Sequence, residues 1–276
     1  MKAVLGLWIA LLLVFVGVPA QALESFVLYD DFQVERIDAN KWSSSTFGGG
    51  VPAEIVQQID NGELHRFLRA YGQTNSNTGL SGGTSSLTFK NSALVTAIKS
   101  TVTFTQATTV SCPLNPEPTR VRLVISGSFF NRDSIAHDPG DFTHDVVADF
   151  RITRRSDTPP GMLRAAASVF QCQDRDCNDT IDYADLDLGL IELNKAMTLS
   201  MQHDVDNSRF IFTVGSATAV GSYPVAAVSP TSNPEKSIDL RVRVANCTAA
   251  PRPAGTIELL MDNVFVNASA ASAVAR

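Results

Sequence analysis

An acidic segment after Cys172 contains a set of oxygen donors spaced as in a calcium-binding loop. Counted from Asp174, oxygen-bearing side chains occupy positions 1, 3, 5, 7, 9 and 12 of that template. The residues concerned are Asp174, Asp176, Asn178, Thr180, Asp182 and Asp185. Because Ca²⁺ takes six to eight oxygen ligands, the spacing indicates a structural calcium site, and no other cofactor is expected. Asp179 stands where the template has glycine and Asp185 where it has glutamate, so a solvated acidic loop is the alternative.

The four cysteines predict two disulfides in an oxidising compartment. Cys172 and Cys177 flank one short polar loop, which favours their pairing and leaves Cys112 to pair with Cys247. A zinc site is the competing interpretation, but the sequence has no paired C-x-x-C spacing with a histidine nearby.

The segment from His137 to Asp145 holds two histidines and three carboxylates, which are donors that suit a transition metal. The histidines are seven residues apart across the turn at Pro139-Gly140, and an ordinary surface turn is the preferred interpretation. The sequence contains no G-x-S-x-G nucleophile motif and no glycine-rich phosphate loop followed by lysine.

Most of the chain shows the alternation of apolar and polar residues that is typical of strands, and these strands must position the residues described above. Apolar and polar residues alternate along 120–125, 197–202, 210–214 and 240–244, in each case with one apolar and one polar face. Such segments, separated by Gly, Pro, Asn and Asp clusters, predict an all-β, antiparallel two-sheet sandwich or a barrel. Met162–Gln171 is the best candidate helix, although a strand there suits its neighbours better. One domain is expected from residue 23 to residue 267, followed by a flexible tail, 268–276.

Three N-terminal motifs resemble the opening of concanavalin A-like lectin/glucanase jelly rolls, which include laminarinase-type glycoside hydrolases and laminin G-like modules. They are YDDF at 29–32, IDANKW at 37–42 and DNGEL at 60–64. The resemblance implies a jelly-roll fold in which Phe32 and Trp42 are core residues and Gly62 turns the chain. It also implies a hairpin from Met197 to Val214 and a closing strand, 255–267, beside the first strand.

The glycoside hydrolases of that superfamily carry two catalytic glutamates in an E-x-D-x-x-E pattern, and no glutamate of this sequence lies in one. Asp145 and Asp149 share one strand face by their spacing, but a solvated strand edge explains them equally well. No catalytic residue is therefore assigned.

The first 22 residues resemble a cleaved secretory signal peptide. Lys2 precedes an apolar run that is too short to span a membrane, and Ala20-Gln21-Ala22 forms an A-x-A cleavage site. The mature protein is expected to be secreted or periplasmic, without membrane insertion. The chain of 276 residues has 22 Lys+Arg against 28 Asp+Glu, a balance that excludes a general attraction to nucleic acid.

These features predict a secreted, non-catalytic jelly-roll protein that binds carbohydrate or another extracellular ligand on its concave sheet or rim loops. The partner would be an extracellular polysaccharide or glycan. Two alternatives remain: an extracellular structural or adhesion protein without sugar binding, and a glycoside hydrolase-like enzyme with unrecognised carboxylates.

Overall fold

The computed structural model describes residues 25–49, 52–133, 137–224 and 229–274. The predicted signal peptide, residues 1–22, lies outside them. Within the described residues, the regular structure is almost entirely antiparallel strand. The helices are one 3₁₀ turn, η1 (Ser92–Leu94), and one short α-helix, α1 (Ala268–Val274).

Two antiparallel sheets, here called sheet A and sheet B, contain these strands. Sheet A has the order β13-β12-β11-β6-β15-β4-β3, with β1 paired to β15. Its strands are β1 (Phe26–Asp30), β3 (Ala53–Asp60), β4 (Glu63–Tyr71), β6 (Ala97–Thr109), β11 (Ala196–Asp204), β12 (Arg209–Val214), β13 (Ala217–Ser222) and β15 (Ala254–Asn267). Sheet B has the order β10-β9-β8-β7-β14-β5-β2. Its strands are β2 (Trp42–Gly48), β5 (Leu80–Phe89), β7 (Arg120–Asn131), β8 (Asp145–Arg155), β9 (Met162–Cys172), β10 (Thr180–Glu192) and β14 (Lys236–Ala245).

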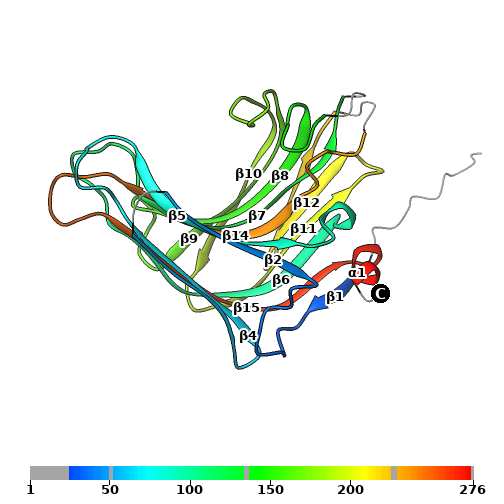
Figure 1. Ribbon diagram of the computed structural model, residues 1–276, viewed down its shortest axis with the longest axis horizontal. Coiled ribbons are helices and arrows are strands. Elements are labelled where there is room, and N and C mark those ends of the chain that lie inside the picture. Colours follow the sequence, from blue (N-terminus) through cyan, green and yellow to red (C-terminus); the bar gives the residue numbers. More distant parts are fainter. Residues whose placement is uncertain (1–24, 50–51, 134–136, 225–228, 275–276) are drawn as a thin grey trace, which may run out of the picture.

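The sheets pack face to face and bend together, with sheet B on the inner side of the bend (Figure 1). Alternate residues of each strand enter the space between them, as the period-two pattern predicted. Phe150 of β8 meets Phe212 of β12 there, with ring centroids 5.9 Å apart. One apolar cluster extends from Tyr29 to Ala270. The predicted all-β, antiparallel jelly-roll sandwich is confirmed.

The N-terminal motifs fold as the resemblance implied. Phe32 and Trp42 are buried, and the Trp42 indole Nε1 donates a hydrogen bond to Asp30 Oδ2 at 2.7 Å. Asn61 and Gly62 both have positive φ, at 52° and 79°, which a tight turn between β3 and β4 requires. The motifs therefore specify core packing and one turn.

The later predicted elements are also present. Strands β11 and β12 form the hairpin predicted for Met197–Val214, with Leu199 opposite Val214. Strand β15 pairs with β1, as expected of a closing strand. The stretch Met162–Gln171 lies in strand β9, because its alternate residues Leu163, Ala165 and Ala167 are fully buried between the sheets.

Both predicted disulfides are confirmed. Cys112–Cys247 joins the segments that follow β6 of sheet A and β14 of sheet B, with Cα atoms 5.5 Å apart. Cys172–Cys177 closes the start of the β9–β10 connection. The first bond therefore links the two sheets at one end, and the second fixes the acidic segment to the end of β9.

The C-terminal segment differs from the flexible tail that its small residues suggested. Residues 268–274 form α1, which lies beside β1 (Figure 1). Ala270 is fully buried in the main apolar cluster, and its carbonyl accepts a hydrogen bond from Asn91 Nδ2. Alanine is small enough to pack closely and favours helix, so the same composition supports an ordered element. Within the described residues no helix is long and apolar enough to cross a membrane.

Candidate functional site

The outer surface of sheet B, here called the concave face, is assembled by strand register. Residues opposite one another on antiparallel strands point to the same side of a sheet. A row that crosses the face at its centre contains Phe47, Thr84, Arg241, Arg122, Thr153 and Arg164 on successive strands from β2 to β9. Arg243, Arg120 and Arg155 form a second row next to it.

Seven arginines therefore lie together on strands β7, β8, β9 and β14, although the chain as a whole is acidic. They are Arg120, Arg122, Arg151, Arg155, Arg164, Arg241 and Arg243. Five of them border an open hollow of about 390 Å³, whose other lining residues include Thr153, Pro159 and Leu190. We call these seven residues the arginine cluster.

Part of the arginine cluster is neutralised by neighbouring aspartates. Ion pairs join Arg164 to Asp187 at 2.6 Å and Arg241 to Asp239 at 2.6 Å. Arg151 and Arg155 make longer pairs of 3.6 Å and 3.3 Å with Asp185 and Asp157. These four arginines are therefore held in place by carboxylates of the protein itself.

Arg120, Arg122 and Arg243 have no carboxylate within ion-pair distance among the described residues. The Nε atoms of Arg120 and Arg122 are buried and make no hydrogen bond there. Burial, followed by the charges of Arg120 and Arg241, lowers the pKa of Arg122 to about 10, while Asp149 opposes the shift. Burial and the same kind of repulsion lower the pKa of Arg243. An arginine keeps its charge at neutral pH in spite of such shifts, so a bound anion would relieve the repulsion within this group.

Hydroxyl groups and one aromatic ring surround these charges. Thr84 and Ser86 of β5 and Thr153 of β8 lie on the same face. Phe47 at the β2 edge is 65% exposed, in a row with Thr84 and Arg241. The face can thus offer cations, hydroxyl hydrogen bonds and one apolar platform to a ligand.

Two tyrosines in polar stretches of the sequence, Tyr71 and Tyr223, lie elsewhere. Tyr223 is buried and hydrogen-bonded to His203. Tyr71 is on sheet A, where its hydroxyl donates to Glu54 and Arg252 lies over its ring at 5.2 Å. Neither contributes to the concave face.

Asp145 and Asp149, the nearest imitation of a catalytic pair, occupy different environments. Asp145 is fully buried, where it accepts hydrogen bonds from Asn131 Nδ2 and Thr231 Oγ1. Burial raises its pKa in spite of those bonds. Asp149 lies in a second hollow on the concave face and accepts a hydrogen bond from Ser126. Asp145 therefore links the segments of Asn131 and Thr231 by hydrogen bonds, and it is not accessible to a substrate on the concave face.

The proposed calcium ligands are divided between a turn and a strand. Asp174 accepts the backbone N–H groups of Asn178 at 2.8 Å and Asp179 at 3.3 Å. Asp176 and Asn178 are exposed in the same turn. The acidic turn is thus closed by hydrogen bonds from its own backbone.

From Thr180 onward the chain is strand β10, so the last three proposed ligands lie along a sheet edge. Thr180, Asp182 and Asp185 line the second hollow of the concave face, and Asp185 pairs with Arg151. Calcium binding by these residues stays a prediction. An unchanged melting temperature in excess calcium and in chelator would exclude it.

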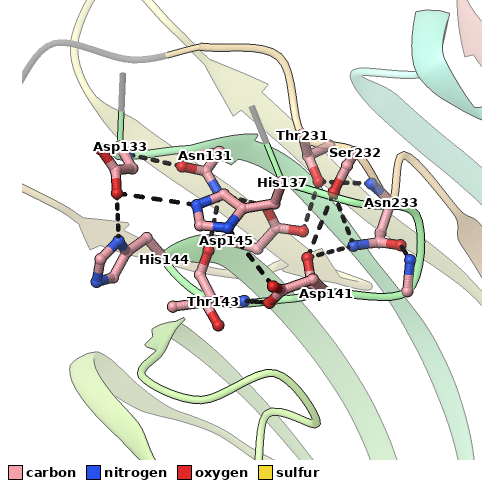
Figure 2. Close-up of polar contacts among 11 residues, drawn as sticks. Asn131, Asp133, His137, Asp141, Thr143, His144, Asp145, Thr231, Ser232 and Asn233 are labelled. Carbon is pink, nitrogen blue, oxygen red and sulfur yellow. Dashed lines mark hydrogen bonds and ion pairs between the residues drawn. The ribbon is translucent and has the colours of Figure 1, made fainter. Parts of the chain in front are cut away.

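The histidines of the β7–β8 connection come together more closely than their spacing suggested. The rings of His137 and His144 have centroids 6.1 Å apart, and Asp133 lies between them (Figure 2). One ligand-type atom from each of these three residues lies within 4.8 Å of the others. The sequence favoured an ordinary turn there and did not include Asp133.

The comparisons with known proteins find distantly similar solved structures but no family and no curated relative. No protein-family model matches the chain, and no curated protein matches it significantly. Among solved structures, LamAcat from Zobellia galactanivorans matches with 8% identity and a TM-score of 0.45, over 90% of this chain and 99% of that one. A family 16 endo-glucanase from Bacteroides ovatus matches with 10% identity and a TM-score of 0.42, over 86% and 98%.

A GlcNAcα1-4Gal-releasing endo-β-galactosidase from Clostridium perfringens matches with 10% identity and a TM-score of 0.42, over 89% of this chain. The chain spans 63% of the length of that structure. Values this low assign neither activity nor substrate. The bent pair of antiparallel sheets is a jelly-roll sandwich, as the N-terminal motifs led us to expect.

The arginine cluster is the feature that sequence reasoning missed. Its signal was present, because Arg120 and Arg122, like Arg241 and Arg243, alternate with buried valine and leucine. From the sequence alone, these pairs indicate only the polar faces of two strands. Strands β7 and β14 are neighbours in the sheet although they are more than a hundred residues apart in the chain. The sequence does not show this pairing.

Proposed function

We propose that the protein binds an anionic polysaccharide along the concave face, without cleaving it. The observation that carries the proposal is the group formed by Arg120, Arg122 and Arg243. These three cations lie side by side on one sheet face, and none of them has a carboxylate within ion-pair distance among the described residues. A folded protein stabilises such a group best when a ligand supplies the missing negative charge.

The chemistry of guanidinium groups selects the ligand class. Arginine presents a planar fork of N–H donors that matches carboxylate and sulfate oxygens in pairs. Neighbouring Thr84 and Thr153 can exchange hydrogen bonds with sugar hydroxyls, and Phe47 can cover an apolar ring face. A uronate or sulfated sugar combines all three requirements, whereas a neutral glucan would leave the cations unpaired.

The extent of the face favours a polymer over a single small molecule. Seven strands at about 4.8 Å spacing give a width of roughly 30 Å. Both hollows on this face are open, and the polar groups follow the rows across the strands. An extended chain lying along the central row would pass Phe47, Arg241, Arg122 and Arg164 in turn.

Binding without cleavage is proposed because Asp145 and Asp149, the carboxylates that the sequence placed on one strand face, are not exposed together on the concave face. Asp145 is sealed by Asn131 and Thr231, and Asp149 is engaged by Ser126 and lies beside the arginine cluster. The proposed location is secreted or periplasmic, which the two disulfides support.

Affinity electrophoresis of the purified protein tests this function with three polysaccharides: a polyuronate, a sulfated galactan and a neutral β-glucan. We expect retardation by the anionic polymers only, and weaker retardation of Arg122→Gln. Equal retardation by the neutral glucan, or none by any polymer, would contradict it. Incubation with each polymer should release neither new reducing ends nor unsaturated products, and release of either would show an enzyme.

A further inference from the structure

We infer that Asp133, His137 and His144 form a binding site for a divalent first-row transition metal, with Zn²⁺ as the preferred ion. This site is separate from the arginine cluster. It is built on the connection between β7 and β8 at one end of sheet B (Figure 2). Two imidazole nitrogens and one carboxylate oxygen are a donor set typical of zinc and related ions.

Strand register brings two of the ligands together. Asn131 and Asp145 are paired at the end of the β7–β8 ladder, so Asp133 and His144 leave the sheet next to each other. The backbone N–H of Arg132 donates to the His144 carbonyl at 3.0 Å, which extends the pairing by one step. His144 has a φ of 65°, a left-handed conformation that turns its ring toward Asp133.

The distances between the donor atoms are close to those around a bound metal ion. Asp133 Oδ2 lies 3.1 Å from His144 Nδ1 and 3.8 Å from His137 Nε2. Tetrahedral zinc with bonds of about 2.0–2.1 Å places its ligand atoms roughly 3.3 Å apart. Metal binding therefore requires shifts of well under 1 Å at these two contacts, and the donor nitrogens of His137 and His144, which lie within 4.8 Å of each other, would also have to approach.

His137 is oriented as a metal-binding histidine. Its Nε2 is buried, faces Asp133 and makes no hydrogen bond among the described residues. Its Nδ1 faces Asp141 Oδ2 at 3.6 Å on the opposite side of the ring. A carboxylate that faces the second ring nitrogen is the arrangement found around zinc-bound imidazoles.

The supporting residues are themselves held by hydrogen bonds. Asp141 Oδ1 accepts the Thr143 N–H at 2.9 Å, and its backbone carbonyl accepts Asn233 Nδ2 at 2.7 Å. Asn131 Oδ1 accepts the Asp133 N–H at 2.6 Å. The site is open on one side, since the His144 side chain is 38% exposed and Asp133 23%. An ion can enter, and water would complete its coordination.

Zinc titration of the full-length, metal-stripped protein by calorimetry tests this inference. We expect one equivalent to bind, a melting temperature several degrees higher in excess zinc, and no effect of magnesium. His137→Gln and His144→Gln should each weaken zinc binding at least tenfold. His65→Gln is the matched control: His65 pairs with Glu258 on sheet A, and its loss should leave zinc binding unchanged.

Two further measurements separate a metal site from a structural ion-pair network. Asp141→Asn keeps the three ligands and should weaken zinc binding about 10-fold to 100-fold through the His137 ring. Co²⁺ should give the visible absorption of a tetrahedral site in the wild type and in His65→Gln, and lose it in His144→Gln. Zinc binding that is equal in all variants, or absent from the folded wild type, would overturn the inference.

Discussion

The outer surfaces of the two sheets differ in how completely their basic side chains are paired with carboxylates. On sheet A, His65 pairs with Glu258 at 2.8 Å and Arg69 with Glu54 at 3.3 Å, so basic side chains there meet carboxylates on adjacent strands. On sheet B, Arg122 lies opposite Arg241, and Arg120 lies opposite Arg243 on one side and Arg155 on the other. Like charges directly opposite each other destabilise a sheet.

This difference separates residues that stabilise the fold from residues that we propose bind a ligand. Arg66 is a third case, since it is completely buried between the sheets and donates to the carbonyls of Ile238 and Ser85. Arg66 thereby joins sheet A to sheet B. The net charge of −6 distinguishes none of these three environments, because it is a sum over the whole chain.

The largest expected effect is on ligand affinity. Replacing Arg122 and Arg243 together by glutamine should weaken polyuronate binding about 100-fold or more, since charge-assisted hydrogen bonds contribute roughly 1.5–3 kcal/mol each. Arg69→Gln, on the paired surface of sheet A, should leave affinity unchanged. Isothermal titration with an oligouronate measures both affinities. Equal losses of affinity in the two variants would show that the two surfaces do not differ in ligand binding.

Ionic strength should produce the next largest effect. The screening length falls from about 10 Å at 0.1 M salt to about 3 Å at 1 M, so affinity for an anionic polymer should drop roughly tenfold or more over that range. The same titration repeated in sodium chloride measures this drop. A salt-independent affinity would mean that the arginines do not contact the ligand charges.

Much of the fold followed from local sequence patterns, whereas the candidate site did not. Phe32, Trp42 and Gly62 lie in short motifs whose packing and turn are encoded nearby. The arginine cluster depends on the pairing of β7 with β14, two strands far apart in the chain. Asp133 likewise joins His144 only through the β7–β8 register.

Two phenylalanines, one on the outer surface of each sheet, give a smaller test of the same comparison. Phe47→Ser on the concave face should weaken saccharide binding a few-fold, because a stacked ring contributes on the order of 1 kcal/mol. Phe67→Ser on sheet A is the control, since Arg69 lies over the Phe67 ring at 5.4 Å within a paired surface. A larger loss of affinity with Phe67→Ser would indicate that the saccharide binds on sheet A.

The smallest effect concerns stability without ligand. Arg122→Gln relieves repulsion from Arg120 and Arg241, so its melting temperature should rise by about 1–3 °C. Arg69→Gln breaks the pair with Glu54 and should lower it slightly or not at all. Differential scanning calorimetry in the absence of polysaccharide gives both values. A fall for Arg122→Gln would indicate a structural role for this arginine.

A crystal structure of the protein with an oligouronate tests the central claim most directly. We expect the sugar to lie across the concave face, with carboxylates within hydrogen-bond distance of Arg122 and of Arg120 or Arg243. An oligosaccharide bound on sheet A or at the rim loops, with these guanidinium groups still unpaired, would contradict the account.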